Sequence, residues 1–158
     1  MPNITGIDHI GIAVADLEQV LRWVEKLPEF DLIERRTTLT PSSGMVSAVV
    51  RLGCVTIVFV QGTDEQSHVS EFVRRHGPGI QHVALRVREI DTVLEHSGAS
   101  GLQFATPVLD DIGISQIFSK RDESTGLMLE FIRRSEDVPF SEKNVQRLFE
   151  SMESGGHY

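Results

Sequence analysis

The sequence predicts an α+β fold in which paired βαβββ modules form a single open barrel-like sheet, followed by a C-terminal helix. A repeated motif and a repeated order of elements carry this prediction. Residues 6–14 read GIDHIGIAV and residues 79–87 read GIQHVALRV, so His9 and His82 occupy the same place in two copies of one strand, 73 residues apart. Self-similarity at a fixed period indicates a duplicated structural unit.

The first module is expected to contain one strand, one helix and then three strands. Asp16 is the expected N-cap of the helix, because an aspartate side chain can accept hydrogen bonds from the first turn. A tight Gly53-Cys54 step should join the last two strands as a hairpin. The expected strands span residues 7–14, 30–38, 45–52 and 55–60, and the expected helix spans residues 16–24.

The second module repeats this order after a connecting helix over residues 66–75, which glycine and proline terminate at residues 77–79. A final helix over residues 140–150 presents an apolar stripe, which should dock on the sheet edge or on a partner chain. The stripe consists of Val145, Leu148, Phe149 and Met152. The expected elements of the second module are strands at residues 79–87, 102–104, 113–120 and 126–133, and a helix at 89–96.

We expect these elements to form one domain over residues 5–134, with modules at about 5–62 and 79–134, and residues 135–158 to supply the added helix and tail. No apolar run approaches the length of a membrane span, and residues 1–5 lack the features of a signal peptide, so we expect a cytoplasmic protein. A net charge of -8 argues against a nucleic-acid partner. Cys54, the only cysteine, is expected as a small buried residue of a strand. His68, on the connecting helix, is expected to be solvated.

Three residues are candidate metal ligands. His9 and His82 are equivalent strand residues, and Glu130 interrupts an otherwise apolar strand, where an unpaired buried carboxylate would be costly. Two imidazoles and one carboxylate suit one divalent ion per chain, Fe, Co, Ni, Mn or Zn, and leave coordination positions open for a substrate. In the first module, the position equivalent to Glu130 is Ile57 or Val58. Neither side chain can bind a metal, so the candidate metal site lacks a fourth protein ligand.

The paired modules, the histidine in the first strand of each and the LEFI sequence at residues 129–132 resemble the vicinal oxygen chelate superfamily. This superfamily includes glyoxalase I, methylmalonyl-CoA epimerase and several dioxygenases. The closest motifs are similar to the C-terminal half of 4-hydroxyphenylpyruvate dioxygenase. The size and polar pocket are similar to a cyclitol epimerase that acts on 2-epi-5-epi-valiolone. The first of these similarities implies that six residues contact the substrate: Ser47, Gln81, Gln116, Phe118, Lys120 and Asn144.

Two departures from the dioxygenase decide the predicted function. Only the short segment 107–112 stands where that enzyme has a long covering insertion, and Val145 replaces one of two phenylalanines that clamp its aromatic substrate. An open, polar site favours a metal-dependent epimerase or isomerase that acts next to a carbonyl through a metal-stabilised enolate, on a small hydroxyl-rich ketone such as a cyclitol. Glu130 is the candidate catalytic base, with a metal-bound hydroxide as the alternative, and Lys120 or Glu34 is the candidate for the opposite face of the substrate. An Fe(II)-dependent dioxygenase is the first alternative, and a ring-cleaving dioxygenase and a non-enzymatic ligand-binding protein also stay open. We further expect a homodimer.

Overall fold

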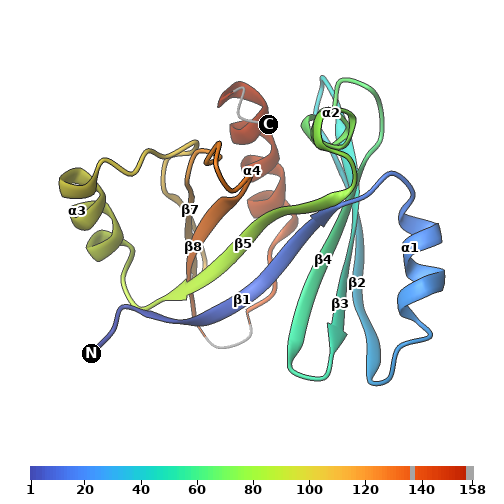
Figure 1. Ribbon diagram of the computed structural model, residues 1–158, viewed down its shortest axis with the longest axis horizontal. Helices are drawn as coiled ribbons and strands as arrows, with labels where there is room; N and C mark the ends of the chain where they lie inside the picture. The colour runs from blue at the N-terminus through green and yellow to red at the C-terminus, as the bar shows by residue number, and fades with distance from the viewer. Residues whose placement is uncertain (136–137, 156–158) are drawn as a thin grey trace. The chain divides into compact units, whose positions relative to one another are not determined.

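The computed structural model describes residues 1–135 and 138–155, which form two compact units (Figure 1). The N-terminal unit consists of residues 9–81, and the C-terminal unit consists of residues 1–8 together with residues 82–155. Residues 136–137 and 156–158 of the predicted C-terminal segment lie outside the described residues. Because the unit boundaries fall within the first strand of each module, each of these strands contributes to both units.

The described residues form eight strands and four helices in an α+β arrangement. Their order along the chain repeats strand, helix and three strands, and all strands belong to a single mixed sheet with the order β2-β3-β4-β1-β5-β8-β7-β6. The predicted fold class is therefore confirmed. The strands are β1 (Ile4–Ala13), β2 (Phe30–Leu39), β3 (Gly44–Leu52), β4 (Val55–Gly62), β5 (Gly79–Val87), β6 (Leu109–Asp111), β7 (Ile114–Phe118) and β8 (Met128–Arg134). The helices are α1 (Leu17–Val24), α2 (His68–His76), α3 (Ile90–Ser100) and α4 (Glu142–Gly155).

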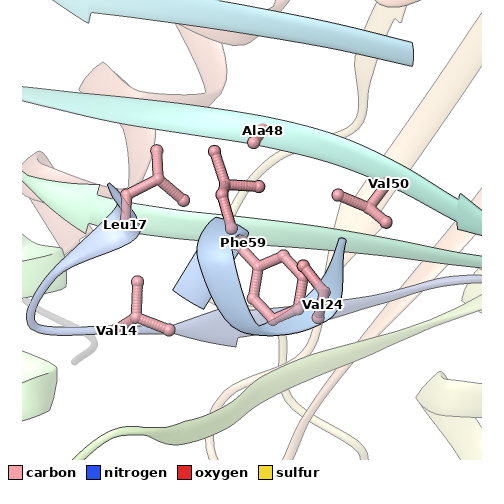
Figure 2. Packing of buried hydrophobic residues seen from close by; sticks show 7 residues of the cluster. Val14, Leu17, Val24, Ala48, Val50 and Phe59 are labelled. Atoms are coloured by element: carbon pink, nitrogen blue, oxygen red, sulfur yellow. The ribbon is translucent and has the colours of Figure 1, made fainter. Parts of the chain in front are cut away.

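The N-terminal unit is a four-stranded sheet, β2-β3-β4-β1, with α1 packed on one face. Asp16 caps α1 as predicted, since its carboxylate accepts a bond from the backbone N–H of Gln19 at 2.9 Å. The buried side of α1 meets alternate residues of β3 and β4, and Figure 2 shows this packing. The core consists of Val14, Leu17, Leu21, Val24, Ala48, Val50 and Phe59. The opposite face of this sheet is the one that carries His9.

The C-terminal unit is a sheet in the order β1-β5-β8-β7-β6 with helices on both faces. Helix α3 packs on the side of Ile117 and Phe131, whereas α4 packs on the side of Phe118 and Met128. Within α4, Phe149 is 1% exposed and Met152 is 5% exposed. Phe149 and Met152 of the apolar stripe are thus buried on a face of their own sheet, whereas Val145 and Leu148 are half-buried. The stripe gives no support to the predicted homodimer, which stays a prediction.

A capping contact from the N-terminus begins α3. The N-cap residue Glu89 makes no side-chain capping bond of its own. Instead, Asn3 Oδ1 accepts from the backbone N–H of Glu89 at 2.9 Å, and Asn3 Nδ2 donates to the Glu89 carbonyl at 3.0 Å. A residue outside the helix therefore supplies the cap, and it also fixes the start of β1 to the unit.

Three predictions about individual segments are wrong. Residues 102–104 form only an isolated bridge between Phe104 and Ser119, and the strand that pairs with β7 is β6, because the turn at Gly113 returns the chain directly. Cys54 is exposed because it lies in the β3–β4 turn rather than in a strand. His68, which we expected to be solvated, is buried where α2 packs on β4. None of the helices in the described part of the chain has the length and apolar character to cross a membrane.

Candidate metal and substrate site

His82 and Glu130 share one face of the C-terminal unit. In the parallel pairing of β5 with β8, Ala84 is the partner of Glu130, and His82 lies two residues earlier in β5, so the side chains of both histidine and glutamate project from the same face. Glu130 is 1% exposed in a strand whose neighbours are apolar. The strand pairing therefore places a buried carboxylate next to an imidazole.

The distance between the two side chains fits ligands of one ion. His82 Nε2 and Glu130 Oε2 are 3.6 Å apart, which is longer than a good hydrogen bond. Two atoms that each bind a divalent ion at about 2 Å lie about 3 Å from one another, so a small adjustment would let both bind the same ion. The rings of Phe118 and His82 make a T-shaped contact with their centroids 5.3 Å apart, which limits the rotation of the imidazole.

A buried pair of amides lies on the same face of this unit. Gln116 Nε2 donates to Asn144 Oδ1 at 3.0 Å and joins β7 to α4. Gln116 is 0% exposed and Asn144 is 1% exposed, yet Gln116 Oε1 and Asn144 Nδ2 have no hydrogen-bond partner. Buried polar atoms are nearly always satisfied in proteins, so one acceptor and one donor here are available to a ligand.

In the N-terminal unit, strand pairing identifies the place that corresponds to Glu130. In the second module, Glu130 pairs with Ala84, which lies two residues after His82. In the first module, the residue two positions after His9 is Gly11. The partner of Gly11 in β4 is Val58. Of the two residues that the sequence left open, Val58 is therefore the equivalent, and a valine offers no metal ligand. His9 itself is 5% exposed in β1.

The other predicted substrate contacts differ in their surroundings. Ser47 and Gln81 are buried in the N-terminal unit, and their part in binding stays a prediction. Phe118 is buried beside His82, as described above. Lys120 follows β7 and is exposed, and its ammonium group donates to Gln103 Oε1 at 3.0 Å. That placement gives no support to a substrate contact for Lys120.

One buried charged group was not predicted. The side chain of Asp8 is 2% exposed and lies 3.0 Å from Arg86 Nη2 and 3.4 Å from Arg134 Nη2. The Arg134 guanidinium lies over the ring of Phe140, with its central carbon 4.4 Å from the ring centroid. Asp8 immediately precedes His9, and an acidic residue inside an apolar strand was the available signal. These ion pairs hold β1, β5 and β8 together within the C-terminal unit.

Comparison with known proteins identifies the family. The model of the Glyoxalase/Bleomycin resistance protein/Dioxygenase superfamily matches residues 8–137, and the chain belongs to this superfamily. An uncharacterised protein of Synechocystis sp., slr0090, is 28% identical over 107 residues, which are 65% of this chain and 32% of that protein. The chain therefore spans about a third of the length of this curated relative.

Solved structures of two differently named enzymes share the fold. A triple variant of 4-hydroxymandelate synthase from Streptomyces coelicolor matches 96% of this chain and 54% of its own, with a TM-score of 0.83 and 20% identity. Methylmalonyl-CoA epimerase from Mycobacterium tuberculosis matches 85% of this chain and 91% of its own, with a TM-score of 0.70 and 24% identity. At these identities the similarity establishes the fold, and the chemistry has to be argued from the residues.

Proposed function

We propose that the protein is a metal-dependent epimerase or isomerase that acts at a carbon next to a carbonyl group. The observation that carries this proposal is the pair of His82 and Glu130, two ligand types 3.6 Å apart on a face that also presents the buried amides of Gln116 and Asn144. The membership of the superfamily supports it, because epimerases and dioxygenases are both found on this fold.

In this proposal His9, His82 and Glu130 hold one divalent ion, with Fe, Co, Ni, Mn and Zn as the candidates. The donor set of two imidazoles and one carboxylate suits such ions, and Val58 at the fourth position leaves room for a substrate oxygen. The bound ion would supply Lewis-acid stabilisation of the negative charge that develops on a carbonyl oxygen when the neighbouring C–H loses its proton.

The residues of the chain would bind and orient the substrate. The open donor of Asn144 and the open acceptor of Gln116 match a hydroxyl group, which both accepts and donates. Phe118 supplies an apolar wall beside His82. A small hydroxyl-rich ketone, such as a cyclitol, fits this combination, and Ser47 and Gln81 are further candidate contacts. Glu130 is the proposed base that removes the proton, and the second acid or base stays unassigned.

An Fe(II)-dependent dioxygenase is the second candidate function. The likeness in fold to 4-hydroxymandelate synthase, which extends over 96% of this chain, is the observation that favours it. The same three ligands would serve, so the two functions differ in the use of oxygen rather than in the site. A short 107–112 segment with a three-residue β6 favours the epimerase, because oxidative chemistry requires a site closed to water.

The test is isotope exchange under controlled oxygen. Purified protein loaded with each candidate metal is incubated anaerobically in D2O with a panel of cyclitol ketones and hydroxyketones. We expect deuterium next to the substrate carbonyl, detected by NMR, with no reductant required. Activity that appears only with Fe(II) and air, with oxygen incorporated into the product or CO2 released, would replace the epimerase by the dioxygenase.

A further inference from the structure

A bulge in β2 determines the direction of the Glu34 side chain. The register of β2 against β3 shifts between Leu32 and Glu34, because Ile33 is an extra residue in the ladder. As a result Glu34 pairs with Val49 instead of Ala48, whose side chain packs in the core under α1. Successive residues of a strand point to opposite faces, so the bulge turns Glu34 to the face opposite α1. Bulges commonly re-aim a side chain in this way next to an active site.

Glu34 lies in the same row of the sheet as Val58. Val49 pairs with Glu34 on one side and with Val58 on the other, and Val58 in turn pairs with Gly11. These four residues form one row across β2, β3, β4 and β1, and directly paired residues point to the same face. That face carries His9, because His9 lies two residues before Gly11. Glu34 is the only member of the row with an ionisable side chain.

The row leads from the proposed metal position to Glu34. Val58 is the strand equivalent of Glu130, so in the proposed function the ion faces Val58, which leaves a coordination position open. Adjacent strands are about 4.8 Å apart, so Glu34 lies about 10 Å from Val58 across β3. Val58 and Val49 are both only partly buried, and a substrate of a few carbon atoms fits above them. Glu34 therefore borders the far side of a substrate bound at the open position.

Arg36 orients the Glu34 carboxylate on this face. The two residues are two positions apart in β2, so their side chains point the same way, and Arg36 Nη2 pairs with Glu34 Oε1. The side chain of Glu34 is 32% exposed, so the ion pair is partly open to water. Ion pairs in such positions contribute little to stability, so Arg36 orients the carboxylate without preventing its protonation. A group that gains and loses a proton in each cycle needs this balance.

We propose that Glu34 is the second acid–base residue of the epimerase. This assignment rests on the proposed function and names the group that it leaves open. In one direction, the Glu130 carboxylate takes the proton from the carbon next to the carbonyl, and the carboxyl group of Glu34 gives a proton to the other face of that carbon. In the reverse direction, the Glu34 carboxylate takes the proton and Glu130 gives one. Each turnover leaves one of the two groups protonated, and proton exchange with water restores the starting form.

Two other charged groups fit this role less well. Lys120, the alternative candidate from the sequence, is exposed after β7 and bonds elsewhere. Asp31 is the other carboxylate of β2 on this face, since its partner Arg51 lies two residues from Val49. Its side chain is 56% exposed, compared with 32% for Glu34, and it belongs to the next row of the sheet. Asp31 therefore provides a matched control.

The test follows proton exchange and inversion of the stereocentre separately. The probes are single stereoisomers of chiral hydroxyketones, of which acetoin is the smallest, and of cyclitol ketones, incubated anaerobically in D2O with metal-loaded protein. Glu34→Gln should lower inversion at least about 100-fold, because a positioned acid–base group contributes about 10²- to 10⁴-fold. It should still exchange the proton of one stereoisomer with retention, since Glu130 can remove a proton and return a deuteron on its own face. A merely structural role of Glu34 would lower both signals together.

Glu34→Asp, which keeps a carboxylate on a shorter side chain, should recover part of the inversion, and Asp31→Asn should keep all of it. Metal content and thermal unfolding of each variant should match the unmodified protein, because Glu34 is not a ligand. Full inversion in Glu34→Gln, or an equal loss in Asp31→Asn, would overturn this assignment and leave the epimerase in place. Loss of exchange together with inversion in Glu34→Gln would also overturn it. Absence of exchange in the unmodified protein with every probe would overturn the proposed function and this assignment together.

Discussion

Gln116 of β7 donates to Asn144 of α4 at 3.0 Å, and this bond joins two segments 28 residues apart on the face that carries Glu130. Both side chains are almost fully buried, and each keeps one polar atom without a partner. A pair chosen for stability alone would satisfy all four atoms or be replaced by apolar residues. The pair is therefore better explained by a ligand that completes it.

Asn144→Ala should destabilise the protein by about 1–3 kcal/mol, because it leaves the Gln116 amide buried without its bond. The Gln116→Leu/Asn144→Leu double variant should recover much of this loss, since two apolar residues need no partners, while any turnover or ligand binding is lost. Urea unfolding of the three proteins measures the effect. Lys143→Ala, at an exposed position of α4, is the control. A double variant that is less stable than Asn144→Ala would contradict this account.

Metal binding should depend on each of the three proposed ligands. His9→Ala, His82→Ala and Glu130→Ala should each sharply reduce metal content and abolish turnover, because removal of one ligand from three leaves too few donors to hold the ion. Metal analysis of protein dialysed against a defined metal buffer measures the occupancy. His96→Ala, an exposed histidine of α3, should keep full occupancy. Full metal content in folded His82→Ala would contradict the proposed metal site.

Val58→Glu should add a fourth ligand. Val58 is the strand equivalent of Glu130, so a carboxylate introduced there would approach the ion from the corresponding position of the first module. We expect tighter metal binding and lower turnover, because the new ligand occupies a position that the substrate needs. Val58→Gln and Val58→Leu separate ligation from side-chain size. Equal metal affinity in Val58→Glu and Val58→Leu would argue against the module correspondence at this site.

His68 should make the stability of the protein depend on pH. Burial lowers the pKa of His68 from 6.5 to about 4, because the charged imidazole is poorly solvated in its pocket. Between about pH 4 and pH 6.5, the imidazole of His68 is protonated in the unfolded chain but neutral in the folded chain. The stability of the folded state is therefore highest above about pH 6.5 and decreases as the pH falls toward 4. The full loss corresponds to about 3 kcal/mol.

The free energy of unfolding, measured by urea at pH 7 and at pH 5, tests the role of His68. Its decrease over this interval should be smaller in His68→Gln, which cannot be protonated, than in the unmodified protein. His96→Gln, at an exposed position, should retain the full decrease. An identical pH dependence in His68→Gln and the unmodified protein would show that other groups account for it.

Much of the fold followed from the sequence because its signals are local. The repeated motif located His9 and His82 at the same place of two strands, and the bounds of β5 agree with the predicted 79–87. The apolar strand around Glu130 and the capping residue Asp16 were also readable, since strand alternation and helix capping depend on residues a few positions apart. The family resemblance rested on these same short patterns, and the superfamily match confirms it.

The tertiary structure decided which side chains meet and which are buried. No local pattern distinguishes buried His68 from a solvated histidine, because its burial depends on the packing of α2 on β4. The exposure of Cys54, in contrast, follows from its place in the local turn between β3 and β4. The cap that Asn3 supplies to α3 joins residues 86 positions apart. The amide pair of Gln116 and Asn144 exists only because α4 docks on the sheet. Burial and partner choice are properties of the packed chain, and sequence periodicity fixes only the faces that are available for packing.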